Sequence, residues 1–128
     1  MKISGIIKRD SSRRPFKSEK ITSAILKAMR SSKDGDLHDA EKITLDVYAT
    51  LSERNEKITN YIPSVEEIQD VVEQKLMQSQ YLGAAKSYIL YRNKQSEKRK
   101  RNIFEKRINL KPYEYPELYE YVPAIRHS

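Results

Sequence analysis

The chain has 128 residues, enough for one domain with a buried core, and its 25 Lys and Arg against 18 Asp and Glu give a net charge of +7. It has no cysteine, which excludes a disulfide framework, a zinc ribbon and a thiol nucleophile. No run approaches the ~20 apolar residues that span a bilayer, and no apolar stretch typical of a signal peptide follows the first residues. We therefore expect a cytoplasmic protein without membrane contact.

The positive charge lies in two blocks. Residues 1–30 carry nine Lys and Arg against two Asp and Glu, a net charge of +7. Residues 31–91 have a net charge of −5, from six basic and eleven acidic residues, and residues 92–107 one of +6, from eight basic and two acidic residues. Because an acidic segment separates the two basic blocks, we do not expect one continuous basic face for nucleic acid.

The first thirty residues predict a β-hairpin followed by a helix. Residues 2–9 are typical of a strand, and the Asp-Ser-Ser sequence at 10–12 is typical of a turn. Residues 13–16 return as a short edge strand, because Pro15 cannot donate to a strand ladder. Ser18 is the expected N-cap of a helix. The apolar residues of that helix recur at helical spacing: Ile21, Ala24, Ile25 and Ala28.

Three further helices are expected. The second begins near Asp36 or Asp39, the third begins with a capping box from Ser64 to Glu67, and the fourth follows a break at 79–80. Their candidate inward residues are Ala40, Ile43, Val47 and Leu51 in the second helix, Ile68, Val71, Val72 and Leu76 in the third, and Leu82, Ala85, Tyr88, Ile89 and Tyr91 in the fourth. The predicted fold class is α+β, mostly α.

The basic residues of the hairpin and the following helix form a candidate phosphate site. Helix N-termini offer free N–H groups and a partial positive charge, both of which suit phosphate. Five side chains are expected to converge there on a polyphosphate: Lys8, Arg9, Arg14, Lys17 and Lys20. A solvated basic surface is the alternative that charge alone leaves open.

No pattern in the sequence predicts catalysis. The acids at 66, 67, 70 and 73 lack the Glu-x-x-His pattern of a dinuclear metal centre, and a solvated helix face explains them better. There is no Ser-His-Asp or Cys-His arrangement. We therefore expect neither an enzyme nor a direct metal site in this chain.

Three segments, in the same order, resemble the ATP-cone family. They are Ile7-Lys8-Arg9-Asp10 with Pro15-Phe16, Lys20-Ile21 and Ala24/Ala28; the run from Val65 to Glu73; and the run from Tyr81 through Ala84-Ala85 to Tyr88 and Arg92. Together they cover about residues 3–94. One departure is Ser11, where the family commonly has glycine.

The resemblance implies an N-terminal β-hairpin covering a four-helix bundle, with ATP and dATP as competing allosteric effectors. The resemblance implies that Lys8, Arg9, Lys17 and Lys20 bind the phosphates, and the positive charge of Arg14 makes it a further candidate. The base or ribose would lie near Ile7, Ile21, Val65 and Gln69, and Mg²⁺ would bind through the nucleotide phosphates. The resemblance also implies self-association into an inhibited oligomer with dATP, whereas ATP leaves the holoenzyme active.

Residues 108–128 resemble the start of the radical-generating small subunit of class I ribonucleotide reductase. We therefore expect an ATP-cone at 1–94, a basic linker or helix extension at 95–107, and a truncated start of the small-subunit domain at 108–128. The large catalytic subunit would be the partner of the full-length protein, which would serve deoxyribonucleotide synthesis for DNA replication.

Two alternatives remain open at this point. A basic helical module that binds nucleic acid predicts an affinity that falls steeply with salt. A plain interaction domain would dock a protein through residues 108–128 and bind no nucleotide.

Overall fold

The computed structural model describes residue 3 and residues 5–109, with side chains through Phe104. The chain divides into two units, Met1–Ile89 and Leu90–Ser128. The first unit contains the hairpin, three helices and the start of a fourth. Of the second unit the described part is the remainder of that fourth helix, and the predicted start of a small-subunit domain lies, apart from residues 108 and 109, outside the described residues.

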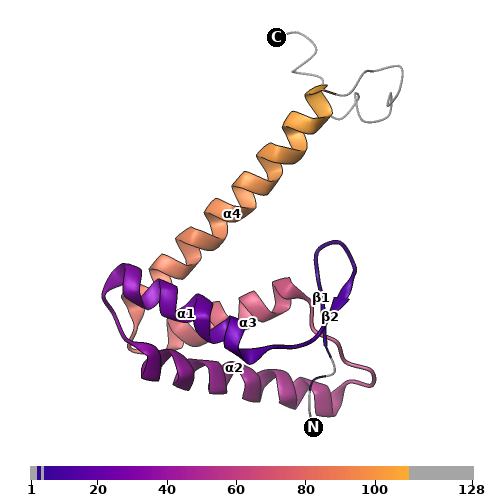
Figure 1. Cartoon of the computed structure of the whole chain (residues 1–128). Coiled ribbons are helices and arrows are strands. Elements are labelled where there is room, and N and C mark those ends of the chain that lie inside the picture. Colours follow the sequence, from indigo (N-terminus) through magenta and orange to yellow (C-terminus); the bar gives the residue numbers. More distant parts are fainter. Residues whose placement is uncertain (1–2, 4, 110–128) are drawn as a thin grey trace. The chain divides into compact units, whose positions relative to one another are not determined.

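The described residues form two short strands and four helices (Figure 1). They are β1 (Ile6–Ile7), β2 (Arg13–Arg14), α1 (Ser18–Ser32), α2 (Leu37–Lys57), α3 (Val65–Gln78) and α4 (Leu82–Asn109). The strands are antiparallel, with Ile6 opposite Arg14 and Ile7 opposite Arg13. The predicted fold class is therefore confirmed. The strands are shorter than the expected 2–9 and 13–16, because the turn already begins at Lys8 and Pro15 ends the ladder.

The hairpin turn requires a left-handed residue. The backbone N–H of Ser11 donates to the carbonyl oxygen of Lys8 at 2.9 Å, and that of Lys8 donates to the carbonyl oxygen of Ser12 at 2.9 Å. Ser11 has a φ of 69°, as in three-residue hairpin loops that place a residue in the αL region after the turn. This conformation explains why glycine is favoured at the position.

The helix starts agree with the sequence in two of three cases. Asp36 caps α2 in a capping box with Asp39. At the start of α3 the Ser64 hydroxyl accepts from the N–H of Glu67, which is one half of the predicted capping box, while the Glu67 carboxylate accepts from Arg54 and Tyr61. The prediction that Ser18 caps α1 is wrong. Ser18 is the first helical residue, and Lys17 occupies the N-cap position without a side-chain cap hydrogen bond.

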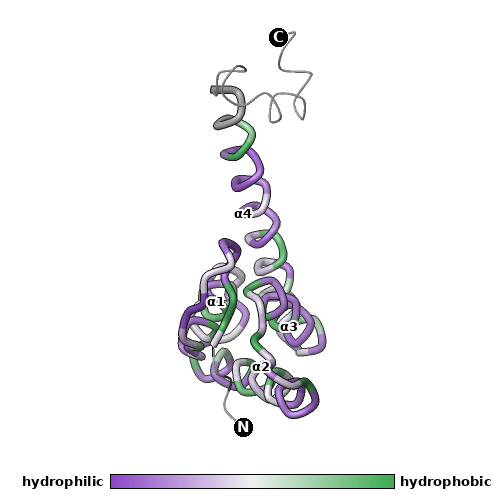
Figure 2. Tube along the Cα trace, turned by 90° about the vertical axis from the view of Figure 1, so that its right-hand side faces the viewer, coloured by the Kyte–Doolittle hydropathy of each residue, from purple (hydrophilic) through white to green (hydrophobic). Residues whose placement is uncertain are grey.

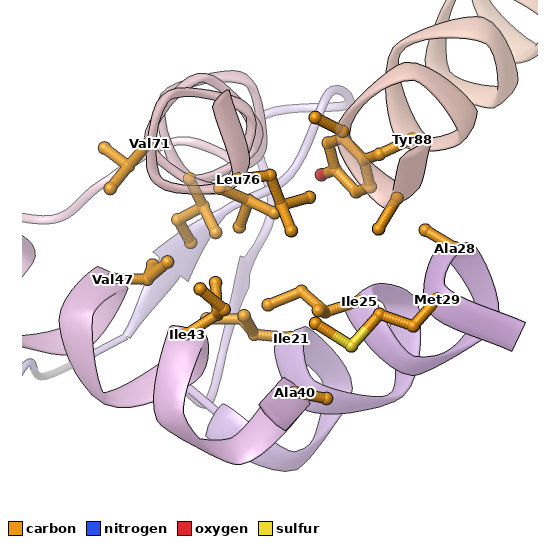
Figure 3. Packing of buried hydrophobic residues seen from close by; sticks show 14 of the residues in the cluster. Ile21, Ile25, Ala28, Met29, Ala40, Ile43, Val47, Val71, Leu76 and Tyr88 are labelled. Atoms are coloured by element: carbon orange, nitrogen blue, oxygen red, sulfur yellow. The ribbon is translucent and has the colours of Figure 1, made fainter. Parts of the chain in front are cut away.

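The core lies among the helices of the first unit, where α2 packs against both α1 and α3. Figure 3 shows side chains from α1, α2 and α3, together with Tyr88, directed toward a common interior. The fully buried side chains include Ile25, Met29, Val47, Leu51 and Leu76. Every inward residue predicted for the second and third helices is buried.

The fourth helix departs from its predicted inward face. Ala85 and Tyr88 are buried as expected, but Leu82 is 63% and Tyr91 61% exposed. Ala84, which the prediction omitted, is fully buried. Leu82 precedes Ala84 by two residues and therefore lies nearly half a turn away around the helix, while Tyr91 lies beyond the end of the first unit.

The described part of the second unit is a mainly hydrophilic helix, as its purple trace in Figure 2 shows. It carries the second basic block and four exposed apolar side chains: Leu90, Tyr91, Ile103 and Phe104. None of the helices within the described ranges is both long enough and apolar enough to cross a membrane.

Candidate functional site

The tip of the hairpin is attached to the start of α3. The Nη2 atom of Arg9 lies 2.7 Å from Oε1 of Glu66 and donates to Oε1 of Gln69 at 3.1 Å. On the backbone, the N–H of Ile7 donates to the carbonyl oxygen of Pro63 at 2.9 Å. These contacts join residues about 60 positions apart and place Arg9, one residue of the first basic block, at the N-terminus of α3.

A second set of contacts fixes the start of α3 to the end of α2. The Oε2 atom of Glu67 accepts from Nη1 of Arg54 and from the hydroxyl of Tyr61, each at 2.6 Å. Burial of Tyr61, and secondarily its hydrogen bond to Glu67, raises the pKa of the phenol to about 12. The α3 terminus is therefore held from the side of α2 as well as by the hairpin.

The remaining predicted phosphate ligands are exposed. Lys8 and Arg14 lie on the hairpin, and Lys17 and Lys20 lie at the start of α1. Next to them, hydrogen bonds from the Ser12 hydroxyl and N–H lower the pKa of Asp10, with smaller contributions from Arg14 and Lys8. The Asp10 carboxylate therefore accepts hydrogen bonds within the turn. Among the described residues it forms no ion pair with the basic side chains beside it.

The start of α1 has no side-chain cap. Lys17 makes no side-chain cap hydrogen bond, so the N–H groups of the first turn have no side-chain acceptor from the N-cap residue. Phe16 packs against Tyr48 of α2, with ring centroids 5.6 Å apart, and anchors the segment between the hairpin and α1. An anchored helix start with lysines at positions 17 and 20 suits a phosphate.

The structure brings together one part of the predicted site and leaves another part separate. Arg9 from the phosphate set contacts Gln69 from the base set, and Ile7 forms a bridge with Ser64, next to half-buried Val65. Ile21, also predicted near the base, is a core residue that is only 8% exposed. Within the described residues no side-chain hydrogen bond or ion pair joins Lys17 or Lys20 to the hairpin tip, so their convergence with Lys8 and Arg14 stays a prediction.

The prediction from the sequence did not include two charged residues of this region, Arg13 and Glu66. Arg13 pairs with Ile7 across the hairpin and so shares its face, whereas Arg14 shares the face of Ile6. A predicted strand register that paired Arg13 with Ile7 would have made Arg13 a candidate site residue. Glu66, the ion-pair partner of Arg9, was assigned to a solvated face, because the sequence carries no signal that joins positions 9 and 66.

Comparison with known proteins gives the family. Residues 4–97 match the model of the ATP cone domain, and the chain therefore belongs to the ATP-cone family. The Vitamin B12-dependent ribonucleoside-diphosphate reductase of Thermoplasma acidophilum is 48% identical over 97 residues, which cover 72% of this chain and 12% of that protein.

Two further relatives are also reductases. The anaerobic ribonucleoside-triphosphate reductase of Escherichia coli K12 is 35% identical over 88 residues, covering 69% of this chain and 12% of the relative. The ribonucleoside-diphosphate reductase subunit alpha of Chlamydia pneumoniae is 37% identical over 98 residues, which cover 70% of this chain and 9% of that protein. The chain thus spans only about a tenth of the length of these relatives, and they do not support the expected fusion to a small subunit.

Proposed function

We propose that the chain is a regulatory domain that senses the ratio of ATP to dATP for a ribonucleotide reductase. Membership of the ATP-cone family and similarity to three reductases support this function. The observation that carries it is the contact between Arg9 and Gln69. It joins the basic hairpin to the start of α3, the two segments predicted to hold the phosphates and the base.

In this proposal the triphosphate binds to the basic residues of the hairpin and of the start of α1: Lys8, Arg9, Arg14, Lys17 and Lys20. The adenine and ribose lie against the start of α3, near Val65 and Gln69, with Ile7 beside them. Ile21 would contribute only a small contact, because it is 8% exposed. The uncapped N-terminus of α1 adds backbone N–H donors to the lysine charges.

Magnesium would reach the site with the nucleotide. Within the described ranges no three His, Asp or Glu side chains form a group that could hold a metal ion. Mg²⁺ prefers to bind through substrate phosphates with one or two carboxylates. The phosphate oxygens are therefore its proposed ligands, and the metal would offset part of the triphosphate charge.

We further propose that dATP promotes an inhibited oligomer and that ATP does not. A ligand shifts an assembly equilibrium only through its differential affinity for the two states. ATP and dATP differ by one ribose hydroxyl, and a site that hydrogen-bonds this hydroxyl can discriminate strongly. In a full-length reductase such assembly would control the contact between the large and small subunits. The resemblance of residues 108–128 alone supports placing the cone on a small subunit.

Calorimetric titration of the 128-residue chain with ATP, dATP and GTP in Mg²⁺ buffer tests the nucleotide site. We expect saturable binding of the two adenine nucleotides and none of GTP. Lys20→Ala should weaken binding at least tenfold, whereas Lys27→Ala, two turns further along the same exposed face of α1, should not. Equal heats from all three nucleotides that vanish with salt would instead indicate an electrostatic surface, as a nucleic-acid-binding module would have.

Sedimentation velocity of the same samples tests the assembly step. We expect a larger species with dATP than with ATP or without nucleotide. Identical sedimentation in all three conditions would contradict self-association through this domain.

A further inference from the structure

The ion pair between Arg9 and Glu66 places a carboxylate where the proposed function needs phosphate. Among the predicted phosphate ligands, all of which the structure describes, Arg9 is the one whose side chain has a hydrogen bond or ion pair to the start of α3, and the Glu66 carboxylate lies 2.7 Å from its Nη2 atom. The Gln69 amide oxygen accepts from the same nitrogen at 3.1 Å. The acceptors of α3 therefore engage one particular nitrogen of the guanidinium group.

That nitrogen is the one that phosphate recognition needs. A guanidinium group binds phosphate most strongly as a two-pronged fork with two parallel N–H donors. Both forks of arginine, Nη1 with Nη2 and Nε with Nη2, include Nη2. A phosphate that binds Arg9 through either fork therefore needs a hydrogen of the nitrogen that already contacts both Glu66 and Gln69.

Glu66 is also the anionic member of the pair of acceptors. A carboxylate that remains beside the guanidinium repels the phosphate, and one that leaves loses its ion pair. Its side chain is 53% exposed, so water screens both effects and each is modest.

We propose that Glu66 competes with bound phosphate for Arg9 and so lowers the affinity of the site for triphosphates. This inference rests on the proposed nucleotide function. It makes Glu66 an affinity-setting residue, which keeps the site responsive at high nucleotide concentration. It also couples binding to the loss of one of the two contacts that Arg9 makes with α3, because each fork uses one of the two hydrogens of this nitrogen.

The test compares Glu66→Gln with Glu41→Gln in the 128-residue chain. Glu41 is exposed and belongs to the first turns of α2. Figure 1 shows that this end of α2 lies away from the hairpin. Each variant removes one negative charge, and the glutamine at 66 can still accept a hydrogen bond. Titrations use ATP, AMP and tripolyphosphate without added metal. We expect Glu66→Gln to raise the affinity for ATP and tripolyphosphate about two- to fivefold beyond Glu41→Gln, and that for AMP less.

A double-mutant cycle with Arg9→Ala shows whether the effect acts through Arg9. In the Arg9→Ala chain, Glu66→Gln and Glu41→Gln should give the same affinities. Equal effects of the two glutamine variants in the wild-type chain, or a lower affinity with Glu66→Gln, would overturn the proposal. A gain for tripolyphosphate in a chain that ignores ATP would support the competition and reject the nucleotide function, and failure of both anions to bind would reject both.

Discussion

The backbone N–H of Ile7 donates to the carbonyl oxygen of Pro63 at 2.9 Å, so the hairpin is attached to the segment that leads into α3. Pro63 is fully buried, and Ser64 beside it caps the helix. This attachment brings the tip residue Arg9 within reach of Glu66 and Gln69. The stability of the hairpin turn and of the α2–α3 junction should therefore affect the candidate site directly.

Replacement of Ser11 by glycine should stabilise the domain. Ser11 has a φ of 69°, a conformation that costs an L-residue roughly 1–2 kcal/mol and glycine little, although glycine loses more entropy on folding. We expect a net gain of about 0.5–1 kcal/mol in the free energy of unfolding, measured by urea denaturation. Ser11→Val should lose at least as much, and a destabilising glycine would contradict the observed turn.

Replacement of Leu51 by alanine should strongly destabilise the first unit. Leu51 is fully buried in the core, so the change leaves a cavity that costs roughly 2–5 kcal/mol. Leu45 on the same helix is 70% exposed, and Leu45→Ala should change the free energy of unfolding by less than about 0.5 kcal/mol. Thermal and urea unfolding of both variants measure the contrast. Similar losses at the two positions would mean that the α2 face is wrongly assigned.

Alanine at position 35 should destabilise the loop between α1 and α2. Gly35 has a φ of 111°, and an added Cβ would lie 2.7 Å from the sulfur of buried Met29. We expect a loss of roughly 1–3 kcal/mol. The control is Gly83→Ala at the start of α4, where the φ is not positive and the nearest atom is a carboxylate oxygen of Asp34 at 3.1 Å. That change should stay within about 1 kcal/mol.

The stability of the domain should fall between about pH 10 and pH 12, in part through Tyr61. Its pKa is about 12 in the folded chain and about 10 in the unfolded chain. Because the folded pKa is the higher one, the stabilisation is complete below pH 10 and is lost as the pH rises through 12. Tyr61→Phe should unfold more easily at pH 8 and lose less stability over this range. Parallel pH profiles of the two proteins would contradict the buried phenol.

The helical part of the fold could be predicted from local pattern. The apolar spacing of residues 40–51 and 68–76 identified both inward faces, and Asp36 and Ser64 identified two helix starts. These features depend on neighbours along the chain, which the sequence displays. The prediction of a Ser18 cap was wrong because a serine at the first helical residue has the same local sequence pattern as a serine at the N-cap.

The candidate site was predictable only as separate segments. The sequence identified the hairpin, the start of α1 and the start of α3, but the pairing of Arg9 with Glu66 depends on packing across some 60 residues. The fourth helix shows the same limit. Its apolar spacing continues past residue 89, so nothing local separates buried Tyr88 from exposed Tyr91.

A nuclear magnetic resonance titration of the 128-residue chain with ATP tests the proposed nucleotide site most directly, because it shows which amide signals the nucleotide perturbs. We expect saturable shifts at three places: the hairpin tip at 8–14, the start of α1 at 17–21 and the start of α3 at 64–69. Shifts confined to the basic residues 92–101 of α4, and lost with added salt, would contradict the proposed site. They would place the anion on the second basic block and remove the hairpin from the function.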